Sequence, residues 1–173
     1  MSTVTQSRKS PSGKAHPAAN KPQIKVEIEE AIRPATKVFA FKDLIGSNDT
    51  SQDDPFGIIK LLRQGVQHGV IERLAEAGLS SKYRQQIIPE RTFQRRQKAG
   101  ERLTLEESER ALRFARIVAE ADRVFGEHEK GMRWLHSPMK QLENQSPLDV
   151  LDTDIGVRLV EEILGQIDEG FFA

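Results

Sequence analysis

The stretch LTLEESERALRFARIVAEADRVFG, from Leu103 to Gly126, decides the fold class of this chain. Thr104 and Glu107 have the spacing of a capping box, in which the two side chains satisfy backbone N–H groups at the start of a helix. Apolar residues then recur every three or four positions, at Leu112, Ala115, Val118, Ala121 and Phe125. This spacing predicts one long amphipathic helix that ends at Gly126.

The residues before this helix, from Pro55 to Gly100, carry no strand pattern and predict four shorter helices. Asp54 followed by Pro55 is typical of a helix start, with the proline at the first helical position. Gly78, Pro89 and Gly100 predict helix ends. The sequence therefore predicts an all-α fold, with several short helices before the long one.

The first part of the chain carries little structural signal. Met1 to about Pro22 is rich in Ser, Lys, Pro and Ala, which predicts a disordered tail. This tail is either an inert leader, which we favour, or a basic tail that attracts phosphate. The pattern from Gln23 to Ile45 is mixed and predicts no firm structure, and the polar stretch from Gly46 to Asp54 predicts a linker.

The composition excludes several classes of function. The 173 residues include no Cys, which excludes disulfide and thiol chemistry and favours a cytoplasmic location. No apolar run approaches the roughly 20 residues that span a bilayer, so we expect no membrane partner. The four His residues are scattered and form no metal-binding pattern. We therefore expect no enzyme, no metal and no cofactor.

Charge is distributed unevenly, although the net charge is zero. Lys82 to Arg102 contains seven basic and two acidic residues. Glu143 to Ala173 contains eight acidic residues and one basic residue. A basic middle and an acidic end predict two surfaces with two different partners.

Two of the short predicted helices, SKYRQQII and ERTFQRRQKAG, lie in the basic middle and are joined by a tight connection, as in a helix-turn-helix. One helix fits the major groove of DNA, where Arg and Gln pair with bases and Lys meets phosphate. The predicted DNA-binding residues are Lys82, Arg84, Arg91, Thr92, Gln94, Arg95, Arg96 and Lys98. The core side of the pair is expected at Tyr83, Ile87, Ile88 and Phe93. The alternative is a charged helix face that contacts only solvent.

The last stretch, Glu129 to Ala173, contains the only Trp and an acidic amphipathic helix that starts near Ile155. The apolar stripe of this helix is Val157, Val160, Ile163, Leu164 and Ile167. We expect Trp134 to be a core residue. Asp152 and Asp154 are the best candidates for a catalytic carboxylate pair, but we expect them to cap the helix instead. The stretch predicts a surface that holds a partner.

A series of landmarks runs from Phe56 to Ala173. They are Gly78-Leu79-Ser80, Gln94-Arg95-Arg96, Leu103 to Gly126, Trp134-Leu135, Pro138, Pro147-Leu148, Leu151-Asp152-Thr153, Ile155-Gly156, Val160, Leu164 and Gly170. Their order and spacing resemble the Xre/MbcA/ParS family of bacterial antitoxins. The resemblance implies an Xre-like helix-turn-helix domain at 55–126 and a small helical toxin-binding domain at 127–173. Residues 1–54 would then be a disordered or weakly structured extension and linker.

The resemblance also implies a function. Such an antitoxin neutralises a RES-domain toxin, an enzyme that consumes NAD or uses it to ADP-ribosylate a target. It also represses its own operon by binding operator DNA, as a homodimer and in a hetero-oligomer with the toxin. In relatives the C-terminal region covers the toxin's active site. The residues that this implies here are Arg158, Glu161, Glu162, Asp168, Glu169, Gly170 and Phe171. The alternative is a stand-alone helix-turn-helix regulator whose C-terminal domain only dimerises.

Overall fold

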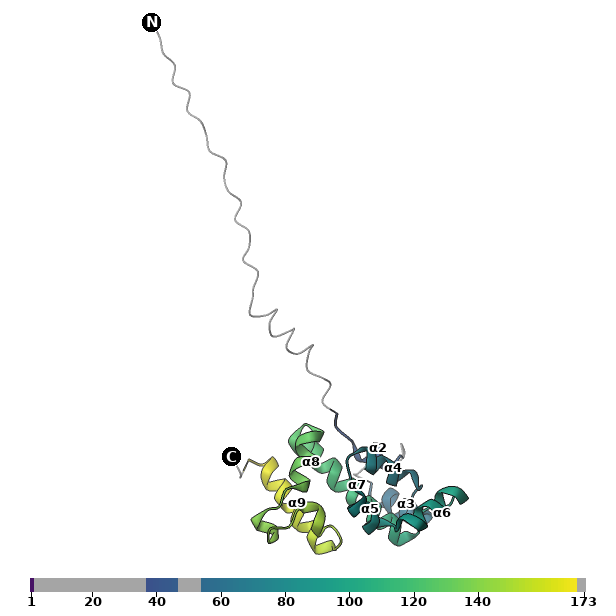
Figure 1. The fold of residues 1–173 in the computed structure, drawn as a ribbon. Helices are drawn as coiled ribbons and strands as arrows, with labels where there is room; N and C mark the ends of the chain where they lie inside the picture. The colour runs from purple at the N-terminus through teal and green to yellow at the C-terminus, as the bar shows by residue number, and fades with distance from the viewer. Residues whose placement is uncertain (2–36, 47–53, 171–173) are drawn as a thin grey trace. The chain divides into compact units, whose positions relative to one another are not determined.

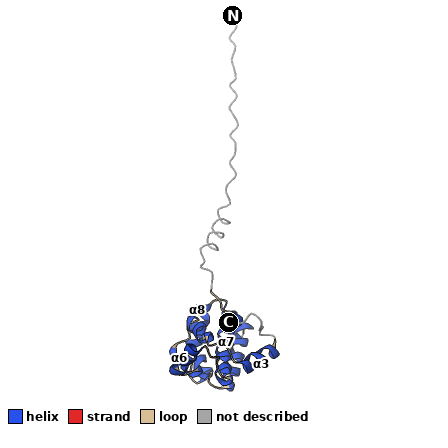
Figure 2. Ribbon diagram, turned by 90° about the vertical axis from the view of Figure 1, so that its right-hand side faces the viewer, coloured by secondary structure: helices blue, strands red, loops and turns tan. Residues whose placement is uncertain are grey.

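The computed structural model describes Met1, residues 37–46 and residues 54–170. The predicted disordered tail, most of the predicted linker and Phe171 lie outside the described residues. The elements are α2 (Phe41–Ile45), α3 (Pro55–Gln64), α4 (Gly69–Glu76), α5 (Ser81–Ile87), α6 (Glu90–Ala99), α7 (Leu105–Phe125), α8 (His128–His136), the 3-10 helices η1 (Lys140–Leu142) and η2 (Pro147–Val150), and α9 (Asp154–Asp168). All regular secondary structure in the described residues is helical (Figure 2), which confirms the predicted all-α fold.

The long helix α7 is the centre of the compact unit formed by Thr36–Ala173 (Figure 1). It packs against α2, α3, α4, α5, α8 and α9. The predicted capping box is present, because the backbone N–H of Thr104 donates to Glu107 at 2.8 Å and the N–H of Glu107 donates back to the Thr104 hydroxyl at 3.3 Å. Leu112 and Phe114, which point to opposite sides of α7, are 6% and 1% exposed. The helix is therefore buried on more than one side, which a helix needs if others are to pack around it.

The four short helices α3 to α6 begin and end close to the predicted positions. Gly65 connects α3 to α4 with a φ of +77°, and a Cβ there would lie 2.4 Å from the carbonyl oxygen of Leu103. The next residue, Val66, donates its N–H to the hydroxyl of Ser108 at 2.9 Å, and Ser108 is fully buried. This contact fixes the connection between α3 and α4 on the surface of α7.

The chain after α7 folds back along it as α8, η1, η2 and α9. Gly156 in the first turn of α9 lies against η2, where a Cβ would be 1.8 Å from the carbonyl oxygen of Val150. The cap of α9 differs from the prediction. The hydroxyl of Thr153 accepts the N–H of Gly156 at 3.0 Å, whereas Asp154 is already the first helical residue. The prediction that Asp152 and Asp154 cap α9 is wrong, because the threonine between them has the extended backbone of an N-cap.

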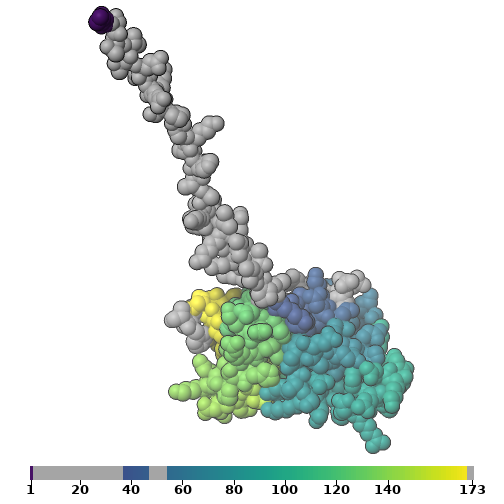
Figure 3. Space-filling view, turned by 45° about the horizontal axis from the view of Figure 1, so that its top comes forward, coloured from purple at the N-terminus to yellow at the C-terminus, as the bar shows by residue number. Residues whose placement is uncertain are grey.

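Residues 37–46, which we call the arm, have an ordered structure that the sequence pattern did not predict. The backbone N–H of Phe39 donates to the carboxylate of Asp122 at 2.8 Å, and His128 lies 2.9 Å from the same carboxylate. At the other end of the arm, Arg73 donates to the carbonyl oxygens of Leu44 and Ile45. Figure 3 shows the dark-blue surface of the arm beside the green of α8. The arm therefore joins α4 to the junction of α7 and α8.

Candidate functional site

The helices α5 and α6 form the predicted pair, with only Ile88 and Pro89 between them. The four residues expected on the core side, Tyr83, Ile87, Ile88 and Phe93, are each at most 8% exposed. Arg110 of α7 donates to the carbonyl oxygens of Gln86 and Ile87, which would otherwise lack partners at the end of α5. The pair is therefore anchored on α7, and its predicted core side is confirmed.

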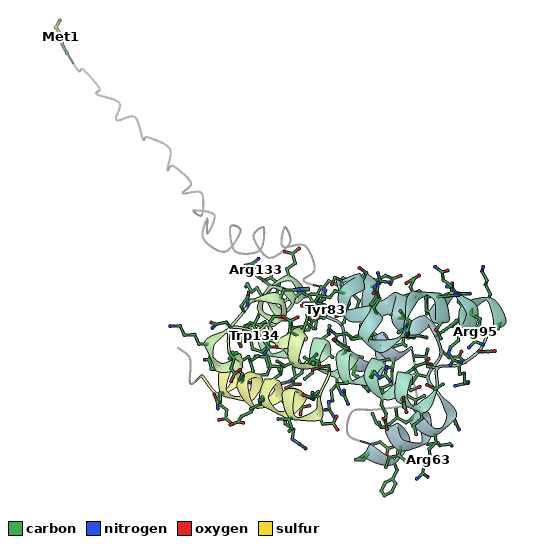
Figure 4. All side chains as sticks on the ribbon, turned by 60° about the horizontal axis from the view of Figure 1, so that its bottom comes forward. Met1, Arg63, Tyr83, Arg95, Arg133 and Trp134 are labelled. Carbon is green, nitrogen blue, oxygen red and sulfur yellow. The ribbon has the colours of Figure 1, made fainter. Side chains whose placement is uncertain are left out.

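The outer side of α6 exposes long polar side chains. Arg91, Gln94, Arg95 and Lys98 are all exposed. The spacing of Arg91, Arg95 and Lys98 by four and three residues puts them on one face of the helix. Among the described residues no ion pair holds any of these three cations. Figure 4 shows Arg95 on the side of the unit away from Trp134. The three cations can contact a polyanion without breaking an ion pair, whereas Gln94 already donates a hydrogen bond to Glu90 at 2.9 Å.

The other predicted DNA-binding residues have internal contacts or partial burial. The Arg96 side chain is 14% exposed, and its Nε lies 3.0 Å from the carboxylate of Glu107. Lys82 pairs with Asp149 of η2. Thr92 and Arg84 are half-buried. The structure thus brings four of the eight residues together on one face, while the DNA role of all eight stays a prediction.

Asp149 connects α5 to η2. Its carboxylate accepts hydrogen bonds from Lys82, from Tyr83 at 3.1 Å and from the hydroxyl of Ser146 at 2.7 Å. Partial burial alone would raise the pKa of Asp149, but the hydrogen bonds from Lys82, Ser146 and Tyr83 outweigh it and lower this pKa to about 2. The hydrogen bond between Lys82 and Asp149 also raises the pKa of Lys82. The first helix of the pair is therefore tied to the C-terminal part of the chain.

Three arginines of α7 pair with three acids of α9, and we call these pairs the α7–α9 ladder. The pairs are Arg113 with Asp154, Arg116 with Glu161 at 2.8 Å, and Arg123 with Asp168 at 3.0 Å. Residue numbers rise together on both helices, so α7 and α9 run parallel. The pKa of Arg123 is raised by its hydrogen bonds to Glu120 and Asp168. The ladder neutralises part of the acidic charge that the sequence places on α9.

The remaining predicted toxin-binding residues of the described chain, Arg158, Glu162, Glu169 and Gly170, are exposed. Two exposed apolar residues on α9 were missed by sequence reasoning. Ile155 is 66% exposed and Leu159 is 44% exposed. Helical spacing could have predicted their exposure, because both lie outside the apolar stripe that packs α9 onto the core. The role of all these residues in toxin binding stays a prediction.

No group of three or more His, Cys, Asp or Glu side chains among the described residues is placed to hold a metal ion. None of the helices in the described ranges has the length and apolar character that a membrane crossing requires.

Two family models match the chain. The antitoxin Xre-like helix-turn-helix domain matches residues 57–116. The antitoxin Xre/MbcA/ParS C-terminal toxin-binding domain matches residues 120–170. The first match contains α5 and α6, and the second contains α8 and α9.

Several proteins are similar to the chain. Antitoxin Xre of Pseudomonas putida is 43% identical over 117 residues, which are 67% of this chain and 74% of that protein. Antitoxin Xre of Yersinia enterocolitica is 37% identical over 87 residues, or 50% of this chain and 59% of that protein. A protein of Sphingobium sp. named Prs ADP-ribosylating antitoxin is 29% identical over 163 residues, which cover 85% of this chain and 99% of that protein.

Proposed function

Because the chain belongs to the Xre/MbcA/ParS family of antitoxins, we propose that it neutralises a RES-domain toxin and represses its own operon by binding operator DNA. In this proposal α9 and the residues that follow it cover the active site of the toxin. The observation that carries the proposal is the presence of both family domains in one chain, each with an exposed charged helix that its own fold leaves available.

The acidic end of α9 supports the toxin-blocking part. Glu162 and Glu169 are exposed, and neither has an ion-pair partner among the described residues. An enzyme that binds NAD needs cationic groups to hold the pyrophosphate, so an acidic helix end complements its active site. The name of the Sphingobium relative supports an ADP-ribosylating toxin as the partner. The residues proposed to meet the toxin are Arg158, Glu161, Glu162, Asp168, Glu169, Gly170 and Phe171.

The exposed face of α6 supports the DNA-binding part. Arg91, Arg95 and Lys98 form a row that can meet phosphates and base edges, and Gln94 lies between them. The proposal includes a homodimer, since operator half-sites mirror a protein twofold axis. It also includes a cytoplasmic location and the division into residues 1–54, 55–126 and 127–173. These three points remain predictions.

The toxin-blocking part is tested by co-expression with the protein encoded beside this chain. Cellular NAD and growth are measured with the full chain, with a chain that lacks residues 168–173, and with the Glu162→Lys and Glu169→Lys double variant. We expect the full chain to preserve NAD and growth, and both variants to lose protection. Glu129→Lys is the control, because Glu129 is an exposed acid on α8. Full protection by the truncated chain would show that the last residue of α9 and those after it are not needed to cover the active site.

The DNA-binding part is tested by gel shift with the promoter fragment that precedes the gene. We expect binding that weakens steeply as salt rises, because counterions are released from the phosphates. Arg91→Ala and Arg95→Ala should each weaken binding. Unchanged binding in the double variant would refute the assignment of the α6 face.

A further inference from the structure

An apolar pocket of about 320 Å³ lies between α7, α8, η1 and the second half of α9. Figure 4 shows Trp134, which lines it, beside α9. The ring of Phe125 lies 5.7 Å from that of Trp134. Six side chains form the lining, and none of them is charged: Phe125, Trp134, Met139, Gln141, Ile163 and Ile167. This lining favours an apolar occupant, because a charged group placed there would lose water and gain no ion pair.

The pocket has unfilled apolar surface and room for a ring. Phe125, Trp134, Met139 and Ile167 are only half-buried. An aromatic side chain seated among them would remove the rest of this apolar surface from water, which is favourable. An apolar cavity of about 150 Å³ already holds a benzene molecule, so this pocket can hold a phenyl ring.

The chain leaves α9 on the side that faces the pocket. Ile163, Ile167 and Gly170 are spaced by four and three residues, so they lie on one face of the helix. Gly170 has a φ of +80°, and its N–H donates to the carbonyl oxygen of Ile167 at 3.0 Å. Both features belong to a Schellman ending, in which the residue after the glycine returns towards the last helical turns and makes an apolar contact there.

Phe171 follows that glycine directly and lies outside the described residues. A Schellman ending would place it over Gly165 and Gln166 of α9, which offer no apolar side chain for this contact. The pocket that Ile163 and Ile167 line offers apolar surface at the same end of the helix.

We propose that Phe171 folds back onto its own chain and seats its ring in this pocket, against Trp134 and Ile167. This contact forms in the free chain, so it goes beyond the proposed function, in which Phe171 meets the toxin. One side chain cannot occupy both places at once. A toxin that binds Phe171 must therefore empty the pocket first, and the filled pocket lowers the affinity of the chain for that toxin.

The experiment uses Trp134 as the reporter, because it is the only Trp of the chain and lines the pocket. The full chain is compared with Phe171→Ser, Phe171→Leu and Phe172→Ser, all without toxin. Phe172→Ser is the matched control, since it removes the same ring from the neighbouring position. The emission wavelength, quenching by acrylamide and the melting temperature are measured at several protein concentrations, and circular dichroism checks the helix content.

We expect Phe171→Ser to shift the Trp134 emission to longer wavelength and to make acrylamide quenching about twofold stronger, because water enters the emptied pocket. The melting temperature should fall by about 4 °C or more, since a buried aromatic ring is lost. Phe171→Leu should restore most of both values, because it returns an apolar side chain. Phe172→Ser should match the wild-type chain, and the helix content should stay the same in all variants.

Three results would overturn the inference. Unchanged emission and quenching in Phe171→Ser would show that the ring does not lie against Trp134, even if the melting temperature falls. An equal change in Phe172→Ser would show that the pocket does not select Phe171. Stronger quenching of the wild-type chain on dilution would show that the ring comes from a second copy. Since no toxin is present, each result is independent of whether the chain neutralises one.

Discussion

Replacing Asp122 with Ala should release the N-terminal end of the arm, around Phe39, from the rest of the molecule. Asp122 is fully buried, and its carboxylate accepts hydrogen bonds from the backbone N–H of Phe39 at 2.8 Å and from the ring of His128 at 2.9 Å. The Phe39 ring also packs edge-on against His128, with centroids 4.7 Å apart. One side chain therefore holds the arm and the start of α8 together.

The size of the effect follows from these two hydrogen bonds. A hydrogen bond to a charged group contributes about 1.5–3 kcal/mol, so the pair contributes roughly 3–6 kcal/mol. The freed arm regains part of this through water. We therefore expect a loss of about 3 kcal/mol, which lowers the melting temperature by roughly 6–12 °C in a protein of this size. Asp122→Asn keeps one acceptor oxygen and should lose about half as much.

Thermal melting and limited trypsin digestion measure the effect. Cleavage after Lys37 and Lys42 should become faster in Asp122→Ala, because the arm opens without global unfolding. Glu129→Ala, which changes an exposed acid on the neighbouring helix, is the control. If Asp122→Ala melts within about 2 °C of this control and its arm is cut no faster, Asp122 does not hold the arm.

Three further predictions concern single contacts. Asp149→Asn should make stability depend less on pH between about pH 4 and 2. The pKa of this carboxyl is lowered from 3.8 to about 2, so the ionised group adds stability above about pH 4 that is lost as pH falls towards 2. Acid titration followed by circular dichroism measures this loss. Gly156→Ala should cost at least about 3 kcal/mol in chemical denaturation, because its Cβ would strike Val150. Arg95→Ala should weaken DNA binding and leave the melting temperature unchanged. Arg96→Ala should lower the melting temperature, because it removes the ion pair with Glu107. A gel shift and a thermal melt of each variant test both expectations.

The long helix could be predicted from sequence because its signals are local. The capping box at Thr104 and Glu107 and the apolar spacing that follows require only neighbouring residues to be read. The core side of the α5–α6 pair was predictable for the same reason. Both features were confirmed, since local preference and tertiary packing agree there.

The arm could not be predicted in this way. The helix α2 has five residues and no side-chain cap, so it has little stability of its own. It exists because Phe41, Leu44 and Ile45 are buried against α4 and α7, and because Arg73 closes its C-terminal end. Tertiary contacts between residues about 30 to 80 positions apart leave no periodic signal in the sequence.

The partners of the charged residues were also beyond sequence reasoning. The helix-turn-helix pattern assigned Lys82 and Arg96 to DNA, and the family resemblance assigned Glu161 and Asp168 to a toxin. In the structure each of these four side chains has an ion-pair partner within the chain. Most of those partners are tens of residues away, as with Lys82 and Asp149, which are 67 positions apart. Only the fold shows which charges already have a partner and which are left available.

The contact between α5 and η2 has a thermodynamic consequence. Asp149 joins α5 of the α5–α6 pair to the turn that leads into α9. If two ligands both bind more tightly when this contact is made, each raises the affinity of the chain for the other, and the two affinities change by the same factor. A DNA titration of the wild-type chain with and without toxin measures that factor, and the same titration of Asp149→Asn shows how much of it depends on this contact. A single carboxylate between the two proposed binding surfaces is thus the point at which occupancy of one would be read at the other.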